Sequence, residues 1–423
     1  MNNTRGEAVP AEIITEPWAR AQDAADPLSS LKADFHHPPG ADGKPLLYFA
    51  GHSLGLQPRR VRQYVNDELD AWARLGVEGH FAGAHPWMPY HELLTAPTAR
   101  LVGALPSEVV VMNTLTVNLH LLMASFYRPT AGRFRIAIEA GAFPSDQYAV
   151  ASQARFHGYD PKTAVLSLEH ARLLVELDRL GPTISLLLLG QPNYLTGEAF
   201  DVPEVMRLSR QHGFAVGLDC AHGAGNLALA LHDWGVDFAA WCNYKYLNAG
   251  PGGLGGVFVH ARHGQRPDLP RFAGWWGHDK RTRFQMGPDF VPCEGAEGWQ
   301  LSNPPMLQLA ALRASMELFD GAGIGALRAR GDRLTASLEI LLDRLPRERV
   351  QLLTPRDPRA RGSMLSLRVS GDAGGLVDRL LARGAVCDFR NPDILRLTPA
   401  PLYSSFADVE RLGTLLAEEL RRG

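Results

Sequence analysis

Short apolar runs alternate with helix-favouring segments between about residues 107 and 260 of the chain. The runs read EVVVM, FRIAIEA, ISLLLLG, FAVGLD and VDFAAWC, and sequences such as TVNLHLLMASF and PEVMRLSRQHG separate them. Nearly continuous apolar strands are typical of a sheet that helices cover on both faces. The alternation therefore predicts an α/β fold with right-handed crossovers and a large, mostly parallel sheet. A further run, GGVFVH, follows the previous one too closely for a crossover and should lie antiparallel or at an edge.

The segments on either side of this region predict further parts of the molecule. Upstream, PRRVRQYVNDELDAWARLG predicts an amphipathic helix that begins at Pro58. Downstream, two helices in series lead to a compact unit of strands and helices. A chain of 423 residues favours two domains. We expect an N-terminal segment (1–57) that packs on the small domain and the substrate site, a large domain (58–320) and a small C-terminal α/β domain (321–423).

Composition excludes several classes of protein. A net charge of −2 with no long run of one sign argues against a nucleic-acid or membrane-surface binder. The run ISLLLLG is too short to span a bilayer, and the N-terminus has no apolar core of a secretion signal. The four cysteines show no CxxC spacing, so we expect reduced thiols in a cytoplasmic protein and no metal site.

Ligands of an open parallel sheet bind at the carboxyl ends of its strands. The residues that directly follow the apolar runs are therefore the candidates for a site. These stretches are 113–118, 142–146, 190–194, 219–222 and 243–245.

Lys245 follows one of these strands in the stretch NYKYLNAGPGG. The chain has five lysines and 38 arginines, so a lysine at this place suggests chemistry that arginine cannot perform. An amine can lose its proton and attack a carbonyl, whereas a guanidinium cannot. The alternative is an ordinary exposed loop lysine.

Asp219 ends the preceding strand, and His222 follows it in DCAHGAGN. A carboxylate that leaves a buried strand needs a cationic partner, and a protonated pyridine nitrogen would be one. A lysine for an aldehyde and a carboxylate for a pyridinium are the two anchors of pyridoxal phosphate (PLP) chemistry. Alternatively, Asp219 is a helix N-cap and His222 a structural histidine. The stretch GAGNLA also fits a dinucleotide fingerprint, but the full helix and the acid-ending strand which that fold requires do not follow it.

A phosphate site is predicted where MNTLTVNLHLL passes from a strand into a helix. The backbone N–H groups of Leu115 and Thr116, and the Thr116 hydroxyl, would face a bound anion there. Phe143 and Asp146 lie at another strand end, where Phe143 could stack on a cofactor ring. A helix cap at Thr116 and a core position for Phe143 are the ordinary alternatives.

These pieces match one family. The sequence resembles kynureninase, a PLP enzyme of fold type I in the aspartate aminotransferase-like superfamily. The resemblance covers most of the chain, including YFAGHSLGLQP, FPSDQYA, DCAHGAGN, LHDWGVDFAAWCNYKYLNAGPGG, GWWGH, LSNPP and LRLTPAPLYSSF. It implies that the large domain binds PLP, that the protein is a homodimer with shared active sites, and that the substrate is a small molecule, an amino acid.

The resemblance also implies roles for single residues. Lys245 would carry PLP as a Schiff base, Asp219 would pair with the ring nitrogen, and Tyr244 is the candidate acid–base of the carbonyl hydration. The residues that would bind the cofactor are Leu115, Thr116, Phe143, Pro144, Ser145, Asp146, Asp219, His222, Tyr244, Lys245, Trp275 and Asn303. The residues that would bind substrate are Ser53, His80, Asn303 and Arg396, with Arg396 on the carboxylate.

The implied reaction is hydrolytic Cβ–Cγ cleavage of L-kynurenine or its 3-hydroxy form to L-alanine and the anthranilate, within tryptophan catabolism or NAD biosynthesis. Two departures from the family stand out: His52 replaces the usual Asn, and Gly190 stands where some members place a Ser near the cofactor. Two rival hypotheses are a cysteine desulfurase-like enzyme, which needs a thiol such as Cys387 over the cofactor, and a PLP-binding protein without turnover.

Overall fold

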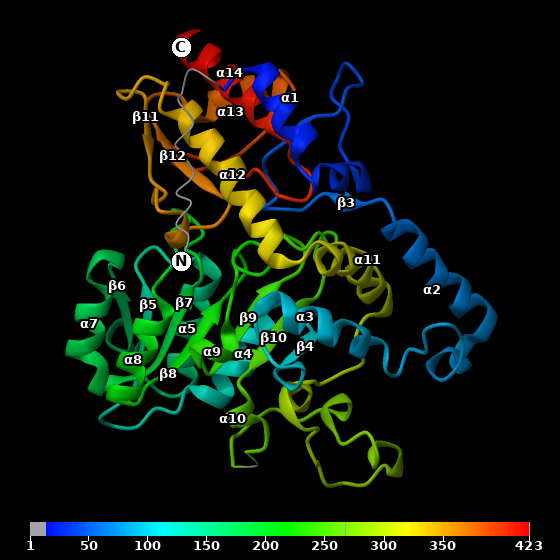
Figure 1. Cartoon of the computed structure of the whole chain (residues 1–423). Helices are drawn as coiled ribbons and strands as arrows, with labels where there is room; N and C mark the ends of the chain where they lie inside the picture. Colours follow the sequence, from blue (N-terminus) through cyan, green and yellow to red (C-terminus); the bar gives the residue numbers. More distant parts are fainter. Residues whose placement is uncertain (1–13, 267, 423) are drawn as a thin grey trace, which may run out of the picture.

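A computed structural model of the chain describes residues 14–266 and 268–422. Its centre is a seven-stranded sheet in the order β4-β10-β9-β8-β7-β5-β6 (Figure 1). From β9 through β8, β7 and β5 to β6, neighbouring strands are parallel. The strands are β4 (Val109–Met112), β5 (Arg135–Glu139), β6 (Val165–Leu168), β7 (Ile184–Gly190), β8 (Ala215–Asp219), β9 (Phe238–Cys242) and β10 (Gly255–Val259). The predicted large, mostly parallel sheet is confirmed.

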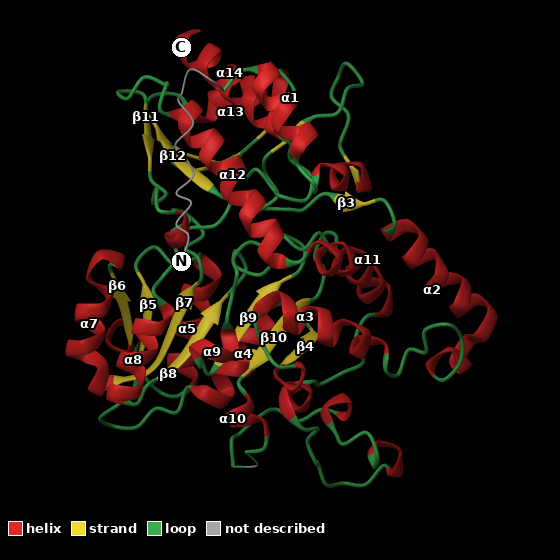
Figure 2. Cartoon of the chain, viewed as in Figure 1, coloured by secondary structure: helices red, strands yellow, loops and turns green. Residues whose placement is uncertain are grey.

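Helices cover both faces of this sheet, as Figure 2 shows. Alternate residues of one strand enter different cores: Leu186 and Leu188 of β7 join one hydrophobic cluster, and Leu187 and Leu189 join the other. This is why the strands are apolar without a break. The helices of this region are α3 (Thr95–Val102), α4 (Leu115–Phe126), α5 (Pro144–Phe156), α6 (Pro161–Ala164), α7 (Leu173–Leu180), α8 (Val202–His212), α9 (Leu231–Trp234), α10 (Ala261–Gly264) and α11 (Met306–Ala322).

Strand β10 corresponds to the run GGVFVH. It pairs antiparallel with β9 on one side and with β4 on the other. The antiparallel direction was expected, because a few residues cannot form a crossover connection. The strand lies inside the sheet, and β4 forms the edge.

A second sheet lies in the C-terminal part of the chain, with the antiparallel order β11-β12-β15-β14. The long helix α12 runs from the large sheet towards this unit in Figure 1. The elements are β11 (Val350–Leu352), β12 (Leu365–Val369), β13 (Ala385–Val386), β14 (Asp388–Arg390), β15 (Ile394–Leu397), α12 (Ile324–Leu342), α13 (Ala373–Ala382) and α14 (Phe406–Arg422).

The described part of the N-terminal segment packs against this C-terminal unit. Helix α1 (Glu16–Ala25) lies beside α14, and β2 (Leu47–Tyr48) pairs parallel with β13 (Figure 1). The Asp23 carboxylate accepts hydrogen bonds from the first N–H groups of α14, and Lys32 forms an ion pair with Asp408. Residues 1–13 of the expected N-terminal segment lie outside the described residues.

Helix α2 (Val61–Leu75) begins later than predicted. Pro58 was expected at its first turn, but it belongs to β3 (Gln57–Pro58), which pairs with β1 (Phe35–His36). Proline fits either place, because it lacks an N–H group at a helix start and on a short edge strand alike. Among the described residues, no helix is both long and apolar enough to cross a membrane.

Candidate functional site

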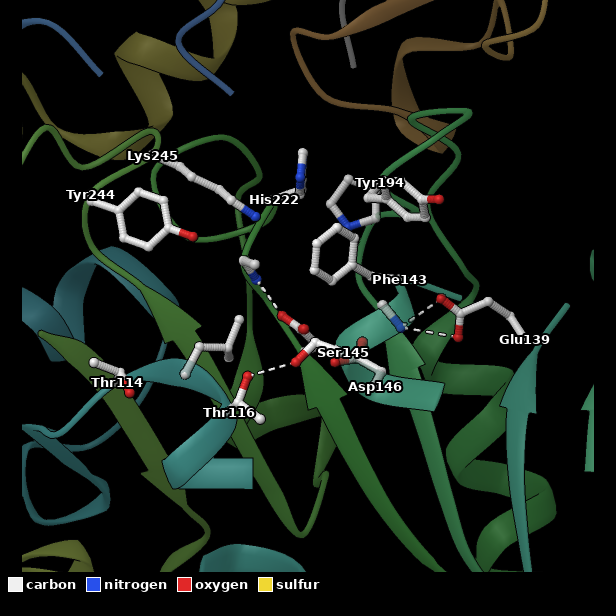
Figure 3. Close-up of a pocket in the computed structure, with 15 residues that line it drawn as sticks. Thr114, Thr116, Glu139, Phe143, Ser145, Asp146, Tyr194, His222, Tyr244 and Lys245 are labelled. Atoms are coloured by element: carbon white, nitrogen blue, oxygen red, sulfur yellow. Dashed lines mark hydrogen bonds between the residues drawn. The ribbon is translucent and has the colours of Figure 1, made fainter. Parts of the chain in front are cut away.

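The carboxyl ends of β4, β5, β7, β8 and β9 surround one cavity (Figure 3). Each of the five candidate stretches contributes to its wall, because parallel strands bring their ends to the same edge of a sheet. The cavity is lined by Thr114, Leu115, Thr116, Glu139, Phe143, Ser145, Asp146, Gly190, Pro192, Tyr194, Asp219, Ala221, His222, Tyr244 and Lys245.

Lys245 projects into the cavity from the loop that joins β9 to β10 (Figure 3). Its Nζ lies 5.7 Å from the centre of the Phe143 ring and 5.9 Å from that of Tyr244. Gly55 supports the loop from outside by donating its N–H to the Tyr244 carbonyl at 2.9 Å. Lys245 therefore lies in the wall of a cavity, on a loop that is held in place. It is not an ordinary exposed loop lysine.

Three acidic side chains share the cavity with this lysine. Burial raises the pKa of Asp219, which the Lys245 ammonium opposes, and Asp219 accepts the Ala221 N–H at 2.8 Å. Burial and the neighbouring Asp219 raise the pKa of Asp146 well above its ordinary value. Burial also raises the pKa of Glu139 to about 7. One lysine cannot neutralise three buried carboxylates, so the site favours a further positive charge or shared protons.

The opposite side of the cavity suits an anion. Helix α4 begins at Leu115, and its N-cap residue Thr114 makes no side-chain cap bond. The Thr116 and Ser145 hydroxyls meet at 2.8 Å where α4 and α5 begin. Two hydroxyls beside helix N-termini suit a phosphate, since free backbone N–H groups there carry partial positive charge. Pro144, the first residue of α5, supports Ser145 but is not among the lining residues.

His222 and Tyr244 flank Lys245 in Figure 3. Burial, aided by the nearby Lys245 ammonium, holds the pKa of His222 well below its ordinary value, so the ring is neutral at neutral pH. Burial raises the pKa of Tyr244, which therefore keeps its phenolic proton and can donate it.

Arg396 lies beside the cavity on β15 and is 1% exposed. Its Nη1 donates to the carbonyl of Tyr194 at 2.7 Å, and Tyr194 itself lines the cavity. Its Nη2 donates to Asp388 Oδ2 at 2.7 Å, while Nε has no partner among the described residues. Part of the guanidinium thus remains available for a carboxylate.

The other expected residues do not line the cavity of a single chain. Ser53 and Asn303 are exposed, and Trp275 is 38% exposed with its Nε1 bonded to the Arg283 carbonyl at 3.1 Å. His80 contacts the Val77 carbonyl at 3.0 Å. One chain alone therefore leaves the proposed aryl end of the site unassembled.

Glu139 was missed by sequence reasoning, although it ends β5 just before a candidate stretch. Both of its carboxylate oxygens accept the N–H of Gly190, at 3.1 and 3.2 Å. A Cβ at position 190 would lie 2.8 Å from Glu139 Oε1, too close for an unshifted neighbour. A side chain at position 190 would therefore require the Glu139 carboxylate to shift.

PLP fits this arrangement. A phosphate would lie at Thr116 and Ser145, an aldehyde within reach of Lys245, and a protonated ring nitrogen would supply the positive charge that the buried acids favour. Asp146 Oδ1 and His222 Nδ1 are buried and lack partners among the described residues, as expected of atoms that face a polar ligand.

Comparison with known proteins agrees with this chemistry. A kynureninase of Myxococcus xanthus is 62% identical over 406 residues, which cover 94% of this chain and 95% of that protein. The chain belongs to the kynureninase family. The model of the kynureninase C-terminal domain matches residues 327–416. The resemblance inferred from the sequence motifs is confirmed.

Solved structures of lower identity show the fold. A C-DES mutant with glycine covalently linked to the PLP cofactor is 19% identical, with a TM-score of 0.73 and coverage of 88% of this chain and 96% of that one. A cysteine desulfurase of Escherichia coli, also 19% identical, gives a TM-score of 0.74 and covers 93% and 98%. The expected fold of type I is confirmed.

The cysteines do not favour a desulfurase-like activity. Cys220, Cys242 and Cys293 are buried, and burial raises the pKa of Cys387 to about 12. None of the four belongs to the lining of the cavity. A reactive thiolate over the cofactor would require the opposite environment.

Proposed function

We propose that the chain is a PLP-dependent hydrolase that cleaves L-kynurenine, 3-hydroxy-L-kynurenine or both into L-alanine and the corresponding anthranilate. The observation that carries this proposal is the meeting of Lys245 and Asp219 in one cavity of a chain that is 62% identical to a kynureninase. The reaction would serve tryptophan catabolism or NAD biosynthesis, and we infer a cytoplasmic enzyme.

Several residues would hold the cofactor. Lys245 would bind its aldehyde, Thr116 and Ser145 its phosphate, and Phe143 would stack on its ring. When bound, PLP supplies an electron sink for the amino acid's Cα. Asp219 would keep the ring nitrogen protonated, because a buried carboxylate is stabilised by an adjacent positive charge.

The chain's own groups would move the protons. The Lys245 amine would act as the base that removes the Cα proton of the bound substrate. Tyr244 keeps its phenolic proton and is placed beside Lys245, so it is our candidate for the acid–base group in hydration of the γ-carbonyl. Neutral His222 can accept or donate a hydrogen bond without adding charge.

Arg396 would bind the α-carboxylate of the substrate, because its Nε is buried and unpaired within the described chain. Ser53, His80 and Asn303 would meet the aryl end of the substrate, and Trp275 and Asn303 would contact the cofactor phosphate. They lie outside the cavity of one chain, and we infer that a second copy of the chain brings them to the site.

An exposed aromatic group supports a homodimer. The Phe284 ring lies 6.0 Å from that of Phe81 and 5.4 Å from that of Trp275, and the three side chains are 53%, 60% and 38% exposed. Adjoining exposed aromatics are typical of interaction surfaces. His80 is the direct neighbour of Phe81, so the same surface would bring residues of the aryl end to the partner.

The proposal is tested by incubating the protein with PLP and L-kynurenine while anthranilate fluorescence and L-alanine are followed. Equal amounts of both products are expected from hydrolytic cleavage. Release of sulfide from cysteine with no cleavage of kynurenine would favour the desulfurase-like rival, with Cys387→Ala as its control. Binding of PLP without turnover of either kynurenine would favour a non-catalytic protein.

A further inference from the structure

A group of buried polar atoms around Arg396 has no hydrogen-bond partner among the described residues. The atoms are His222 Nδ1, Tyr246 Oη and Arg396 Nε. The His52 ring lies 6.2 Å from that of His222, which in turn lies 5.8 Å from that of Tyr246. Buried polar atoms are normally paired, so this group points to a polar ligand between Arg396 and the cavity.

His52 lies beside this group and comes from the N-terminal segment. Its side chain is fully buried, and its Nδ1 lies 2.8 Å from Thr398 Oγ1. Its Nε2 lies 3.3 Å from Asp388 Oδ2, which is an electrostatic contact without the geometry of a hydrogen bond. Burial lowers the pKa of His52 to about 4, so the ring is neutral and has a single N–H at neutral pH. If the Thr398 hydroxyl donates to Nδ1, the ring proton is on Nε2 and faces Asp388.

Asp388 connects this histidine to Arg396. The oxygen that faces His52, Oδ2, accepts from Nη2 of Arg396 at 2.7 Å. The other oxygen, Oδ1, lies 3.1 Å from Nη1 of Arg390. Arginine and a carboxylate prefer a two-point pairing, which would also occupy Nε of Arg396. Here Asp388 contacts His52 and Arg390 as well, and it pairs with Arg396 through Nη2 alone. Nε of Arg396 is left without a partner among the described residues.

The backbone around His52 is held from both sides. Phe49 accepts the Thr398 N–H at 2.8 Å and donates to the Val386 carbonyl at 2.9 Å. Gly55 packs so closely on the active-site loop that a Cβ there would lie 2.3 Å from the Lys245 carbonyl oxygen. The imidazole is thus fixed between the C-terminal sheet and the loop of Lys245.

We propose that His52 is a positioning residue for substrate binding: it holds Asp388 in one-point contact with Arg396 and so keeps Nε of Arg396 free for the α-carboxylate of the amino acid. This inference rests on the proposed function. Loss of the Nε2 contact would let Asp388 close onto Nε and compete with the substrate carboxylate.

Two substitutions separate the two ring nitrogens. His52→Asn places an amide near the position of Nδ1 and loses the contact to Asp388. His52→Gln reaches the position of Nε2 and can keep that contact. The probes are L-alanine, which has the α-carboxylate, and ethylamine, which lacks it. Their dissociation constants are measured from the absorbance change of the PLP-loaded protein.

We expect His52→Asn to raise the dissociation constant of L-alanine about fivefold to tenfold, as for loss of a contact to a charged pair. His52→Gln should stay within about twofold of wild type, and neither variant should change the constant for ethylamine. In turnover, His52→Asn should raise KM for L-kynurenine with little change in kcat, because a carboxylate contact acts on binding.

Other outcomes overturn the inference. An unchanged constant for L-alanine in His52→Asn would show that the Asp388 contact is not needed, and equal changes for both probes would show a merely structural role. If His52→Asn does not fold, Thr398→Val loosens the same ring, and an unaltered L-alanine constant there is equally decisive. Turnover of L-kynurenine by the wild-type protein tests the proposed function separately. If the PLP-loaded wild-type protein shows no absorbance change with L-alanine or with ethylamine, both the inference and the proposed function are contradicted.

Discussion

The cofactor end and the aryl end of the proposed site are assembled in different ways. Thr116, Phe143, Asp219 and Lys245 come from four strand ends of one sheet and line one cavity. By contrast, four residues from outside the sheet are expected at the aryl end or at the cofactor phosphate: Ser53, His80, Trp275 and Asn303. None of them lines that cavity. Sheet geometry alone completes the first end, whereas the second requires another copy of the chain in our proposal. Substitutions at the two ends should therefore behave differently.

The largest effect is expected at the centre of the cofactor end. Lys245→Ala should lower turnover by about 10⁴-fold or more, because it removes both the covalent anchor and the base at Cα. The Schiff base between PLP and Lys245 should make the wild-type protein yellow and should be trapped as an adduct by borohydride. Lys245→Ala should abolish both the colour and the adduct. Peptide mapping of the trapped adduct is the measurement, with Lys280→Ala as a control that keeps it. An adduct on any lysine other than Lys245 would contradict the assignment.

The next effect is expected at Asp219. Asp219→Asn should keep the lysine linkage and lower kcat by about 10²- to 10³-fold, the scale of a lost preorganised charge contact. Absorbance spectra report the linkage, and steady-state kinetics report kcat. Turnover close to that of wild type would exclude pairing of Asp219 with the ring nitrogen.

The cofactor end was also the part that the sequence predicted best. The strands of the large sheet are apolar without a break, and their ends locate the cavity residues to within a few positions. Glu139 was missed because the candidate stretch after its strand begins at residue 142, three positions beyond the end of β5. The edge strand β6 was missed because it is only partly buried and has fewer apolar residues.

Other features could not be predicted because they depend on contacts between distant segments. Helix α1 is stabilised by packing on α14, nearly four hundred residues later, and no local pattern shows this. The pairing of His52 with Asp388 likewise joins the N-terminal segment to the C-terminal sheet. The domain boundaries at residues 57 and 320 stay a prediction.

The aryl end can be tested by mixing two impaired variants at a limiting concentration of PLP. Asn303→Ala should weaken PLP binding about tenfold if Asn303 contacts the phosphate. If sites are shared between subunits, refolding Asn303→Ala together with Lys245→Ala should restore up to about a quarter of wild-type activity, because half of the dimers then contain one intact site. Each variant refolded alone is the control. Mixtures that are no more active than the average of the two variants refolded alone would show that each site uses residues of one chain.

The acidic cluster predicts a pH effect on the stability of the cofactor-free protein. Burial raises the pKa of Glu139 to about 7, so the folded state keeps a proton that the unfolded state releases near its ordinary pKa of 4.5. Stability is therefore fully present below about pH 4.5 and falls as the pH rises to about 7, by up to about 3 kcal/mol from this group. Glu139→Gln should remove that part of the slope. Parallel denaturation curves of wild type and variant across this range would contradict the assignment.

The smallest effect is expected in substrate choice at the aryl end. A polar pocket rejects a ligand that lacks the matching hydroxyl, because its own polar groups are then left unpaired. His80 and Asn303 would supply such groups, so 3-hydroxykynurenine should be accepted at least as well as kynurenine in terms of kcat/KM. His80→Phe should shift that ratio towards kynurenine by a few-fold, roughly the value of one neutral hydrogen bond.

His80 has another possible partner, since its Nδ1 already lies 3.0 Å from the Val77 carbonyl. If that contact is its whole role, His80→Phe changes stability but leaves the substrate ratio as in wild type. The two substrates must therefore be compared on the same preparation of each protein, with Lys44→Ala, on an exposed loop, as the matched control. A strong preference of wild type for kynurenine would show that polar groups at this end do not recognise the ring hydroxyl, whatever the variant does.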